Sequence, residues 1–138
     1  SPVAKFGGSG GDVRHAKRTD STQAPIVKDL RDIGFQVVIT NFGQDFPDLL
    51  CASPFFPAWV LLEVKLPDGK IDRGQLEFFA ESVGPVMVVT DFEGARKAIE
   101  SPETCLSRAE KSRIAAWLVL NPTQATVTVN QFWKMVGR

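Results

Sequence analysis

The order of apolar and polar residues along the chain predicts a helix followed by short strands. Ile26, Leu30 and Ile33 follow the i, i+4, i+7 spacing of one buried helical stripe, and Gly34 stands where such a helix commonly ends. Segments rich in β-branched, aromatic or other apolar residues then predict four strands, over residues 35–40, 48–52, 59–65 and 86–90. Two prolines lie between the second and third segments, so we expect a turn there and an antiparallel pair.

The segments on either side of the fourth predicted strand have helical character. Apolar residues recur at positions 76, 79, 80 and 83, which predicts a helix over residues 75–83, and residues 92–99 predict a second, shorter helix. The strand between these helices is continuously apolar, as is typical of a strand covered on both faces. A strand–helix–strand connection of this kind places the chain in the α/β or mixed α+β class.

Residues 101–138 form an extension with two further elements. Ser107 and Glu110 have the spacing of a capping box, and the residues that follow predict a helix that ends at Asn121. The sequence over residues 123–136 fits a strand or a helix. A helix, a turn and a second element could form half of a helix-turn-helix motif. Two elements that cover one side of the sheet are the favoured interpretation.

Length and composition favour a single soluble globular domain. The chain has 138 residues, of which 43% are hydrophobic and 23% charged, and its formal net charge is zero. Its apolar runs are far shorter than the roughly 18–20 residues that cross a bilayer, and no secretory signal pattern is evident. The spacing of Cys51 and Cys105 favours two reduced, partly buried thiols over a disulfide or a zinc site. We therefore expect a cytoplasmic protein without membrane contact.

The neutral total conceals an uneven distribution of charge. Residues 1–31 carry six bases and three acids, residues 32–93 carry three bases and ten acids, and residues 94–138 carry seven bases and three acids. On charge alone a mixed, solvated surface is the favoured interpretation, because nucleic-acid-binding domains usually have a stronger basic bias. The alternative is an acidic centre that holds cations, flanked by basic segments that hold a polyanion.

The candidate chemistry lies on two of the predicted strands. Side chains alternate along a strand, so Glu63 and Lys65 share one face while Val64 points to the other. Asp48 stands at the start of the preceding strand, and antiparallel pairing can place it beside Glu63. Two charges on one face of an otherwise apolar strand are costly to bury without partners. We therefore expect two carboxylates and a lysine to converge at one end of the sheet, although a salt-bridged sheet edge would use the same residues.

Two carboxylates beside a lysine suit a divalent cation. Mg²⁺ commonly takes one or two protein carboxylates and keeps several waters, and it lowers the pKa of a bound water and offsets charge on a phosphate under in-line attack. Lys65 beside such a cation can orient or deprotonate the attacking water. The single histidine, His15, lies in the basic N-terminal segment, so no serine–histidine–acid set competes with this interpretation.

The order and spacing of short motifs from Arg18 to Ile99 give this arrangement a family context. The motifs are an Ile26-Val27, Leu30-Arg31, Gly34 helix, a loop containing Gly43, then Pro47-Asp48, Glu63-Val64-Lys65, Gln75 and Gly84-Pro85-Val86. This series resembles the PD-(D/E)XK nuclease superfamily, and within it the VRR-NUC-like nucleases of phages and bacteria, which include nucleases similar to Holliday-junction resolvases. The match is imperfect at Arg18 to Gln23, where one residue is interposed, and at Asp45, where relatives commonly have glycine.

The resemblance implies a fold and a division of the chain. The expected fold is α/β and restriction-endonuclease-like, with a mixed central β-sheet flanked by α-helices and a C-terminal helical extension. Residues 1–17 would be a flexible basic arm, residues 18–100 the nuclease core, and residues 101–138 an extension packed on or beside that core. The protein would work in a bacterial cell or in a phage-infected host.

The resemblance also implies roles for individual residues. Asp48 and Glu63 would be ligands of Mg²⁺ or Mn²⁺, with the Val64 carbonyl as a third ligand, and Lys65 would be the catalytic lysine. Gln75 would support the catalytic group or contact a substrate phosphate. For nucleic-acid binding the candidates are Gln23, Arg14, Lys17 and Arg18, although a solvated surface position is the favoured interpretation for each of them alone.

Three functions agree with these residues. The favoured one is a metal-dependent endonuclease that hydrolyses DNA phosphodiester bonds in branched or structured DNA, such as junctions and flaps. The resemblance is compatible with a homodimer that has one site for each strand. The second is a catalytically silent nuclease-fold module that binds nucleic acid or a phage or replication partner, and the retained catalytic side chains argue against it. The third is a sequence-specific restriction or homing endonuclease.

Overall fold

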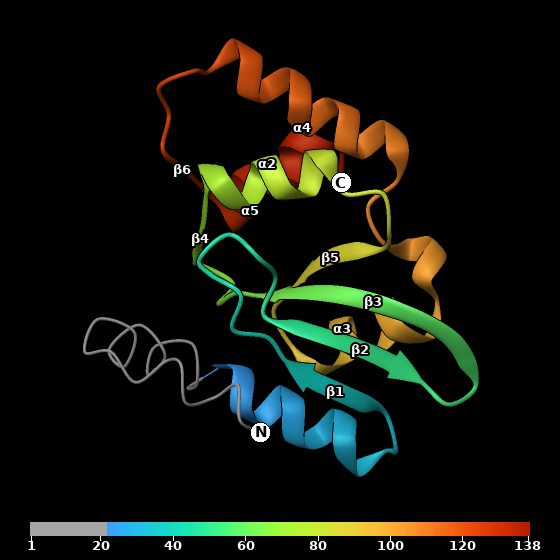
Figure 1. Ribbon diagram of the computed structural model, residues 1–138. Helices are drawn as coiled ribbons and strands as arrows, with labels where there is room; N and C mark the ends of the chain where they lie inside the picture. Colours follow the sequence, from blue (N-terminus) through green and yellow to red (C-terminus); the bar gives the residue numbers. More distant parts are fainter. Residues whose placement is uncertain (1–21) are drawn as a thin grey trace.

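Four strands form a mixed sheet at the centre of the molecule (Figure 1). The computed structural model describes residues 22–138. In sheet order the strands are β1 (Gln36–Ile39), β2 (Leu49–Ser53), β3 (Phe56–Val64) and β5 (Val86–Val89). β1, β2 and β3 are antiparallel neighbours, whereas β3 and β5 are parallel. The predicted antiparallel pair and strand–helix–strand connection are confirmed, and the fold is mixed α/β with helices on both faces of the sheet.

The first described helix covers residues 22–32 and leads into β1. Leu30 is buried, as the apolar spacing predicts, but Ile33 is 43% exposed, so its assignment to the buried stripe is wrong. The helix ends before Ile33 because Gly34 adopts a left-handed φ of 93° and turns the chain. Phe35 then takes the buried position, and its N–H donates to the Leu30 carbonyl at 3.1 Å.

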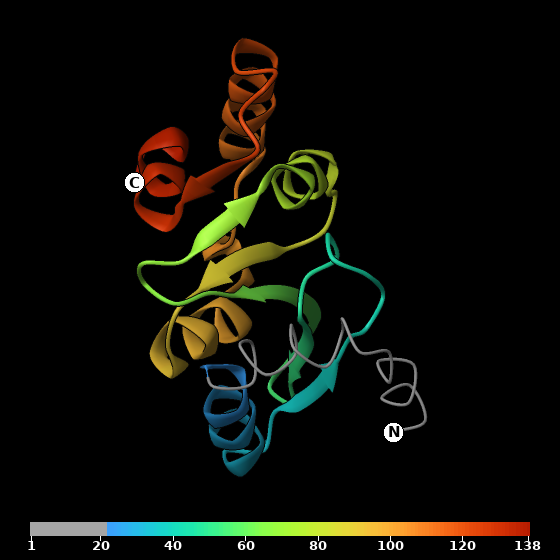
Figure 2. The same cartoon turned by 90° about the vertical axis from the view of Figure 1, so that its left-hand side faces the viewer.

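One face of the sheet packs against this helix and against α3 (Phe92–Glu100), as Figure 2 shows. The buried cluster on this face contains Leu30 from the first helix, Ile99 from α3, and alternate strand residues such as Cys51 and Leu62. The period-two pattern of the strands therefore sends these side chains to one side of the sheet.

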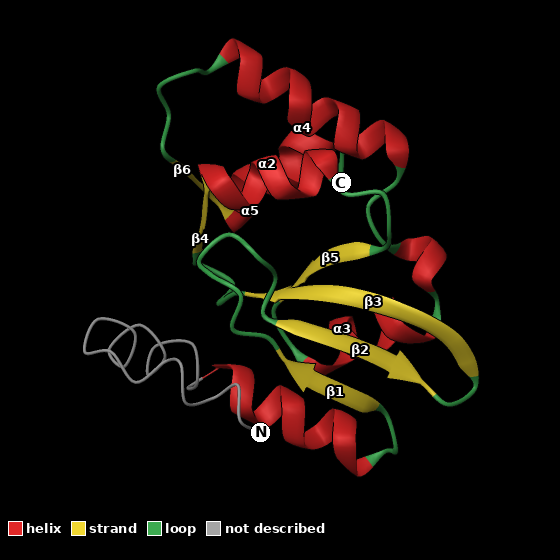
Figure 3. Ribbon diagram, viewed as in Figure 1, coloured by secondary structure: helices red, strands yellow, loops and turns green. Residues whose placement is uncertain are grey.

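The other face carries a second helical layer and a small sheet (Figure 3). The helices are α2 (Arg73–Glu81), α4 (Arg108–Leu120) and α5 (Val129–Val136), and the small antiparallel sheet pairs β4 (Lys70–Asp72) with β6 (Thr126–Thr128). Their apolar residues pack around Phe79 and Phe132, whose rings lie 5.8 Å apart, and around Val86 and Val88 of β5. β5 therefore contributes to the buried clusters on both faces, which is why its sequence is continuously apolar.

Several predicted boundaries on this face differ from the structure. The helix predicted over residues 75–83 begins at Arg73 and ends at Glu81, and Val83 is 97% exposed beyond it. β4 lies within residues 66–72, for which the sequence predicts no strand, and the ambiguous segment over residues 123–136 contains β6 followed by α5. These short strands have no local signal because each three-residue strand depends on its distant partner.

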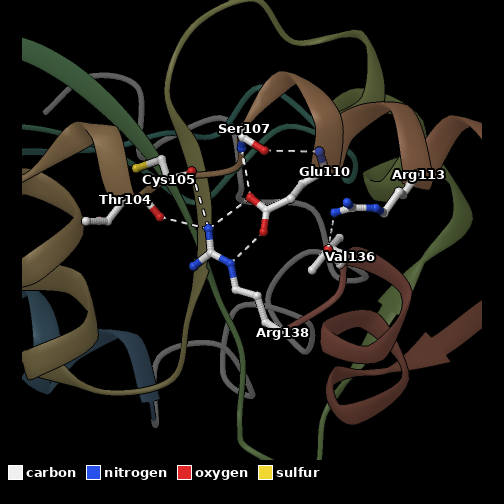
Figure 4. Close-up of polar contacts among 7 residues, drawn as sticks. All are labelled: Thr104, Cys105, Ser107, Glu110, Arg113, Val136 and Arg138. Atoms are coloured by element: carbon white, nitrogen blue, oxygen red, sulfur yellow. Dashed lines mark hydrogen bonds and ion pairs between the residues drawn. The ribbon is translucent and has the colours of Figure 1, made fainter.

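The C-terminal segment is joined to α4 by a cluster of polar contacts (Figure 4). Arg138 donates from Nε to Glu110 Oε2 at 2.7 Å, and from Nη2 to Glu110 Oε1 and the Thr104 carbonyl at 2.9 Å each. Ser107 and Glu110 form the predicted capping box at the start of α4. Arg113 donates to the Val136 carbonyl at 2.8 Å, which ties α4 to α5. A short 3-10 helix, η2 (Pro102–Thr104), leads into this region.

Two further observations concern the described residues. Cys51 and Cys105 are both free and buried, in agreement with the expected reduced thiols. No helix within residues 22–138 has the length and apolar character needed to cross a membrane.

Candidate active site

The loop over residues 41–47 positions the first carboxylate. Thr40, at the end of β1, donates from its N–H to the Asp48 carbonyl at 2.9 Å and from its buried hydroxyl to the Pro47 carbonyl. These two bonds close the base of the loop. The Asp48 side chain then accepts a hydrogen bond at Oδ2 from the Val64 N–H, at 2.8 Å. Asp48 is therefore fixed to β1 through its main chain and to β3 through its side chain.

The second carboxylate belongs to Glu63 on β3 and is almost fully buried, with 2% of the residue exposed. Asp48 precedes Leu49, which pairs with Leu62, and its carboxyl group interacts with that of Glu63, so the two carboxylates are neighbours as predicted. Glu63 Oε2 accepts a hydrogen bond from Gln75 Nε2 at 3.0 Å and lies 3.6 Å from Lys65 Nζ. Glu63 Oε1 is buried and has no hydrogen-bond partner among the described residues.

Gln75 orients the Glu63 carboxylate from the first turn of α2. Its Oε1 accepts a hydrogen bond from the Asp72 N–H at 2.9 Å, which completes a capping box and leaves the NH₂ group directed at Glu63. The same Nε2 also lies 3.4 Å from the Gln44 carbonyl of the 41–47 loop. Gln75 thus joins the start of α2, the loop and β3 at one point.

The electrostatic state of Glu63 follows from its surroundings. Burial raises the pKa of its carboxyl group well above the usual value, and the negative charge of nearby Asp48 raises it further. Lys65 acts in the opposite direction but does not offset the other two effects. The positive charge of Lys65 is therefore too small to keep the buried Glu63 carboxyl group ionised beside Asp48 at its ordinary pKa.

These groups surround a cavity of about 430 Å³. Its lining includes Asp48, Glu63 and Lys65, with Lys70 of β4 and Thr126 of β6 on the far side. No group of three or more histidine, cysteine, aspartate or glutamate side chains gathers anywhere in the described part of the chain, so this site offers two carboxylates. Two carboxylates, a main-chain carbonyl and waters form a suitable set for Mg²⁺, and the unpartnered Glu63 Oε1 is an oxygen available to a cation.

Val64 presents its main chain to the same side of β3 as the Asp48 carboxylate. The Lys65 N–H donates to the Val89 carbonyl of β5 at 3.0 Å, whereas the Val64 N–H points away from β5 to Asp48. The N–H and C=O of one strand residue point to the same side. The Val64 carbonyl is therefore directed to the Asp48 side, as a third ligand must be, while its side chain packs in the core on the opposite face.

The residues predicted to bind nucleic acid are not brought to the site with Asp48, Glu63 and Lys65 within the described part of the chain. Gln23 is 5% exposed and lines a separate hollow with Arg31 and Ile39, whereas its neighbour Thr22 lines the cavity that contains Asp48 and Glu63. The remaining three candidates, Arg14, Lys17 and Arg18, lie outside the described residues.

Two C-terminal bases that could have contacted DNA form structural bonds instead. Lys111 is buried and donates from Nζ to the Ser82 and Gly84 carbonyls at 2.8 and 2.9 Å. Arg113 is bonded to Val136 as described above. The basic character of residues 94–138 therefore owes much to internal contacts.

The structure adds three residues that sequence reasoning did not place at the site. Thr40 closes the loop, and Lys70 and Thr126 line the cavity. Asp45 does not line the cavity; its carboxylate packs against Gly74 of α2, where an added Cβ would clash with it. The polar residue at the end of the apolar β1 segment was a usable signal for Thr40. Lys70 and Thr126 have no such local signal in the sequence, because the pairing of β4 with the distant β6 brings them to the site.

A larger cavity of about 580 Å³ lies between α3 and α5 at the outer edge of β5. Its rim carries Lys97, Lys134 and Arg138, and Asp91 is its one acidic lining residue. With Asp91 as its single carboxylate, this larger cavity does not offer the pair of carboxylates that Asp48 and Glu63 offer.

Comparisons of the chain with protein-family models, with curated proteins and with solved structures find no match. The argument for function therefore depends on the site itself.

Proposed function

We propose that this protein is a metal-dependent endonuclease that hydrolyses DNA phosphodiester bonds, with a restriction-endonuclease-like fold of the PD-(D/E)XK, VRR-NUC-like type. The observation that carries the proposal is the convergence of Asp48, Glu63 and Lys65 on one cavity, with a buried Glu63 oxygen that has no protein partner among the described residues. A sheet edge that merely pairs these charges accounts less well for this oxygen, because most buried polar atoms in proteins have a hydrogen-bond partner.

The cation would be held by the carboxylates of Asp48 and Glu63 and by the Val64 carbonyl. Mg²⁺ or Mn²⁺ in this position supplies the positive charge that lowers the pKa of a water and offsets charge on the phosphate. Two hydrogen bonds orient the carboxylates that would bind the cation. The Val64 N–H donates to Asp48 Oδ2, and Gln75 Nε2 donates to Glu63 Oε2, which leaves Glu63 Oε1 available.

Lys65 would act on the reacting groups directly. Its ammonium lies beside Glu63, and 18% of its side chain is exposed, so it faces the cavity and is accessible to a ligand. It would orient the attacking water and donate hydrogen bonds to the phosphate oxygens as negative charge develops on them. Lys70, also in the cavity lining, would bind a flanking phosphate.

The first experiment is cleavage of labelled DNA by the purified full chain with Mg²⁺ or Mn²⁺. The substrates are a four-way junction, a flap, a single strand and a linear duplex, and chelator and Lys65→Ala serve as negative controls. Lys97→Ala, which removes an exposed lysine on α3, is the matched variant that retains activity. Metal-dependent cutting that is lost in Lys65→Ala supports the proposal. A folded wild-type chain that binds DNA but cuts none of the substrates would instead identify a binding module.

A cut at one site in long linear duplex would favour the restriction-type alternative. Sedimentation of the free chain and its junction complex measures whether two copies act together. A two-fold dimer would place one active site on each of two strands and so predicts a symmetric pair of cuts in the junction.

A further inference from the structure

Phe42 is an exposed aromatic residue beside the catalytic cavity. It is 66% exposed, and the next two residues, Gly43 and Gln44, line the cavity. Gly43 adopts a φ of 121°, which a residue with a side chain rarely takes, so the backbone immediately after Phe42 has a specific turn. The placement of the ring at this wall is thus determined by the loop that also carries Asp48.

A series of aromatic contacts supports the Phe42 ring. Phe42 packs edge-to-face on Phe46 at 5.1 Å between ring centroids, and Phe46 packs in the same way on Phe78 of α2 at 5.2 Å. Phe78 lies one helical turn after Gln75, which holds Glu63. The same helix therefore anchors both the carboxylate and the aromatic series, and it sets their relative position.

Phe42 contributes little to the hydrophobic core. Phe79, the neighbour of Phe78, is fully buried, whereas Phe42 forms no part of either buried cluster. A phenylalanine that is 66% exposed and packs edge-to-face on its aromatic neighbour can offer a ring face to another flat, apolar group. Leu66, which lines the cavity, is 51% exposed as well. The cavity therefore combines a polar interior suited to phosphate with apolar side chains at its margin.

We propose that Phe42 stacks on an unpaired nucleobase next to the phosphate that is cut, and that this contact directs the enzyme to flaps and single strands in preference to continuous duplex. The inference rests on the proposed nuclease function. A base inside a duplex is covered on both faces by its neighbours, so a protein ring can stack only on a base that is unpaired, terminal or extruded. Phosphate contacts alone do not make this distinction.

The test combines a protein variant with a DNA variant. Binding is measured in Ca²⁺ and cleavage in Mg²⁺, with flap DNA that carries either a normal base or an abasic residue at the nucleotide beside the cut. We expect Phe42→Ala to weaken flap binding by about 5- to 160-fold, the range that base–aromatic stacking provides. The abasic flap should weaken wild-type binding by a similar factor. Combining the two changes should cause no further loss, since each removes one partner of the same contact.

Three variants separate stacking from packing. Phe42→Trp should retain flap preference because it keeps an aromatic face, whereas Phe42→Leu should behave like Phe42→Ala although it keeps an apolar side chain. Phe55→Ala removes a more exposed phenylalanine, 85% exposed at the β2–β3 turn, and should leave every substrate unaffected. Thermal unfolding of each variant checks that the fold is retained.

Several results would overturn the inference while leaving the nuclease proposal intact. These are wild-type flap cutting by Phe42→Ala, equal losses on flap and duplex, or additive losses from Phe42→Ala and the abasic residue. A shift from dimer to monomer in Phe42→Ala, with equal losses on all substrates, would assign the ring to a protein contact. A wild-type chain that neither binds nor cuts any DNA would instead overturn the nuclease proposal itself.

Discussion

The Asp48 carboxylate and the Val64 N–H are joined by a hydrogen bond of 2.8 Å, which connects the start of β2 to the end of β3. This bond gives Asp48 a structural role beside its proposed role as a metal ligand. It also places the carboxylate on the side of β3 to which the Val64 carbonyl is directed. The two roles can be separated by substitution, because an amide oxygen can still accept the hydrogen bond but is a weaker ligand for a hard cation.

Asp48→Asn should therefore retain its stability and lose metal binding, whereas Asp48→Ala should lose metal binding and part of its stability. The alanine variant leaves the Val64 N–H without its partner, at an expected cost of about 1–3 kcal/mol in the free energy of unfolding. Urea denaturation in chelator measures this cost, and calorimetric titration with Mn²⁺ measures metal binding. Equal stabilities for the two variants would contradict the structural role.

Glu63→Gln should stabilise the metal-free protein at neutral pH. The folded-state pKa of Glu63 is raised, so its carboxyl group favours folding below its ordinary pKa and disfavours folding increasingly as the pH rises above that value. The glutamine does not titrate, and we expect a gain of about 1–3 kcal/mol at pH 8. Denaturation between pH 4 and 8 in chelator should show the two stability curves diverging as the pH rises.

Addition of Mg²⁺ or Mn²⁺ should reverse this order. Ligand binding to the folded state stabilises it by mass action, so the metal should raise the melting temperature of the wild type and leave Glu63→Gln nearly unchanged. A variant that gains as much from the metal as the wild type would show that Glu63 is not a ligand.

Gln75→Ala should lower metal affinity and cleavage by about 10- to 100-fold, the usual effect of removing a group that orients a metal ligand. The variant loses the Nε2 contact with Glu63 and the capping bond to Asp72. Gln131→Ala is the matched control, since Gln131 forms the same capping box at the start of α5 and accepts the Thr128 N–H at 2.8 Å. Equal losses of affinity in both variants would assign the effect to helix capping.

The contact between Glu110 and Arg138 should make stability sensitive to acid. Hydrogen bonding to Arg138 lowers the pKa of Glu110 to about 2, so its stabilising contribution is complete above the ordinary value near 4.5 and is lost as the pH falls towards 2. Glu110→Gln should lack this dependence and lose about 2–3 kcal/mol at pH 7. Urea denaturation from pH 2 to 7 measures both effects.

Arg96→Ala is the comparison for this contact. It breaks an exposed pair with Glu100 at 3.3 Å and should cost less than about 1 kcal/mol. A similar cost for the exposed and the largely buried pair would contradict the role assigned to Arg138.

The residues that could be predicted from sequence are those whose position follows from local periodicity. The alternation of side chains along one strand placed Glu63 and Lys65 together, and antiparallel pairing added Asp48. The error at Ile33 has a local cause as well, because Gly34 ends the helix before the apolar spacing does. In contrast, Lys70 reaches the site through a pairing with a segment nearly sixty residues later, which no local pattern contains.

The pairing of β4 with β6 also bears on when the site forms during protein synthesis. Asp72, whose N–H fixes the Gln75 amide, pairs with Thr126, and Thr126 itself lines the cavity. While the ribosome is still adding residues before 126, Asp48, Glu63 and Lys65 are present but one wall of the cavity is missing. A nascent chain can therefore complete this pocket only after β6 has left the ribosomal exit tunnel.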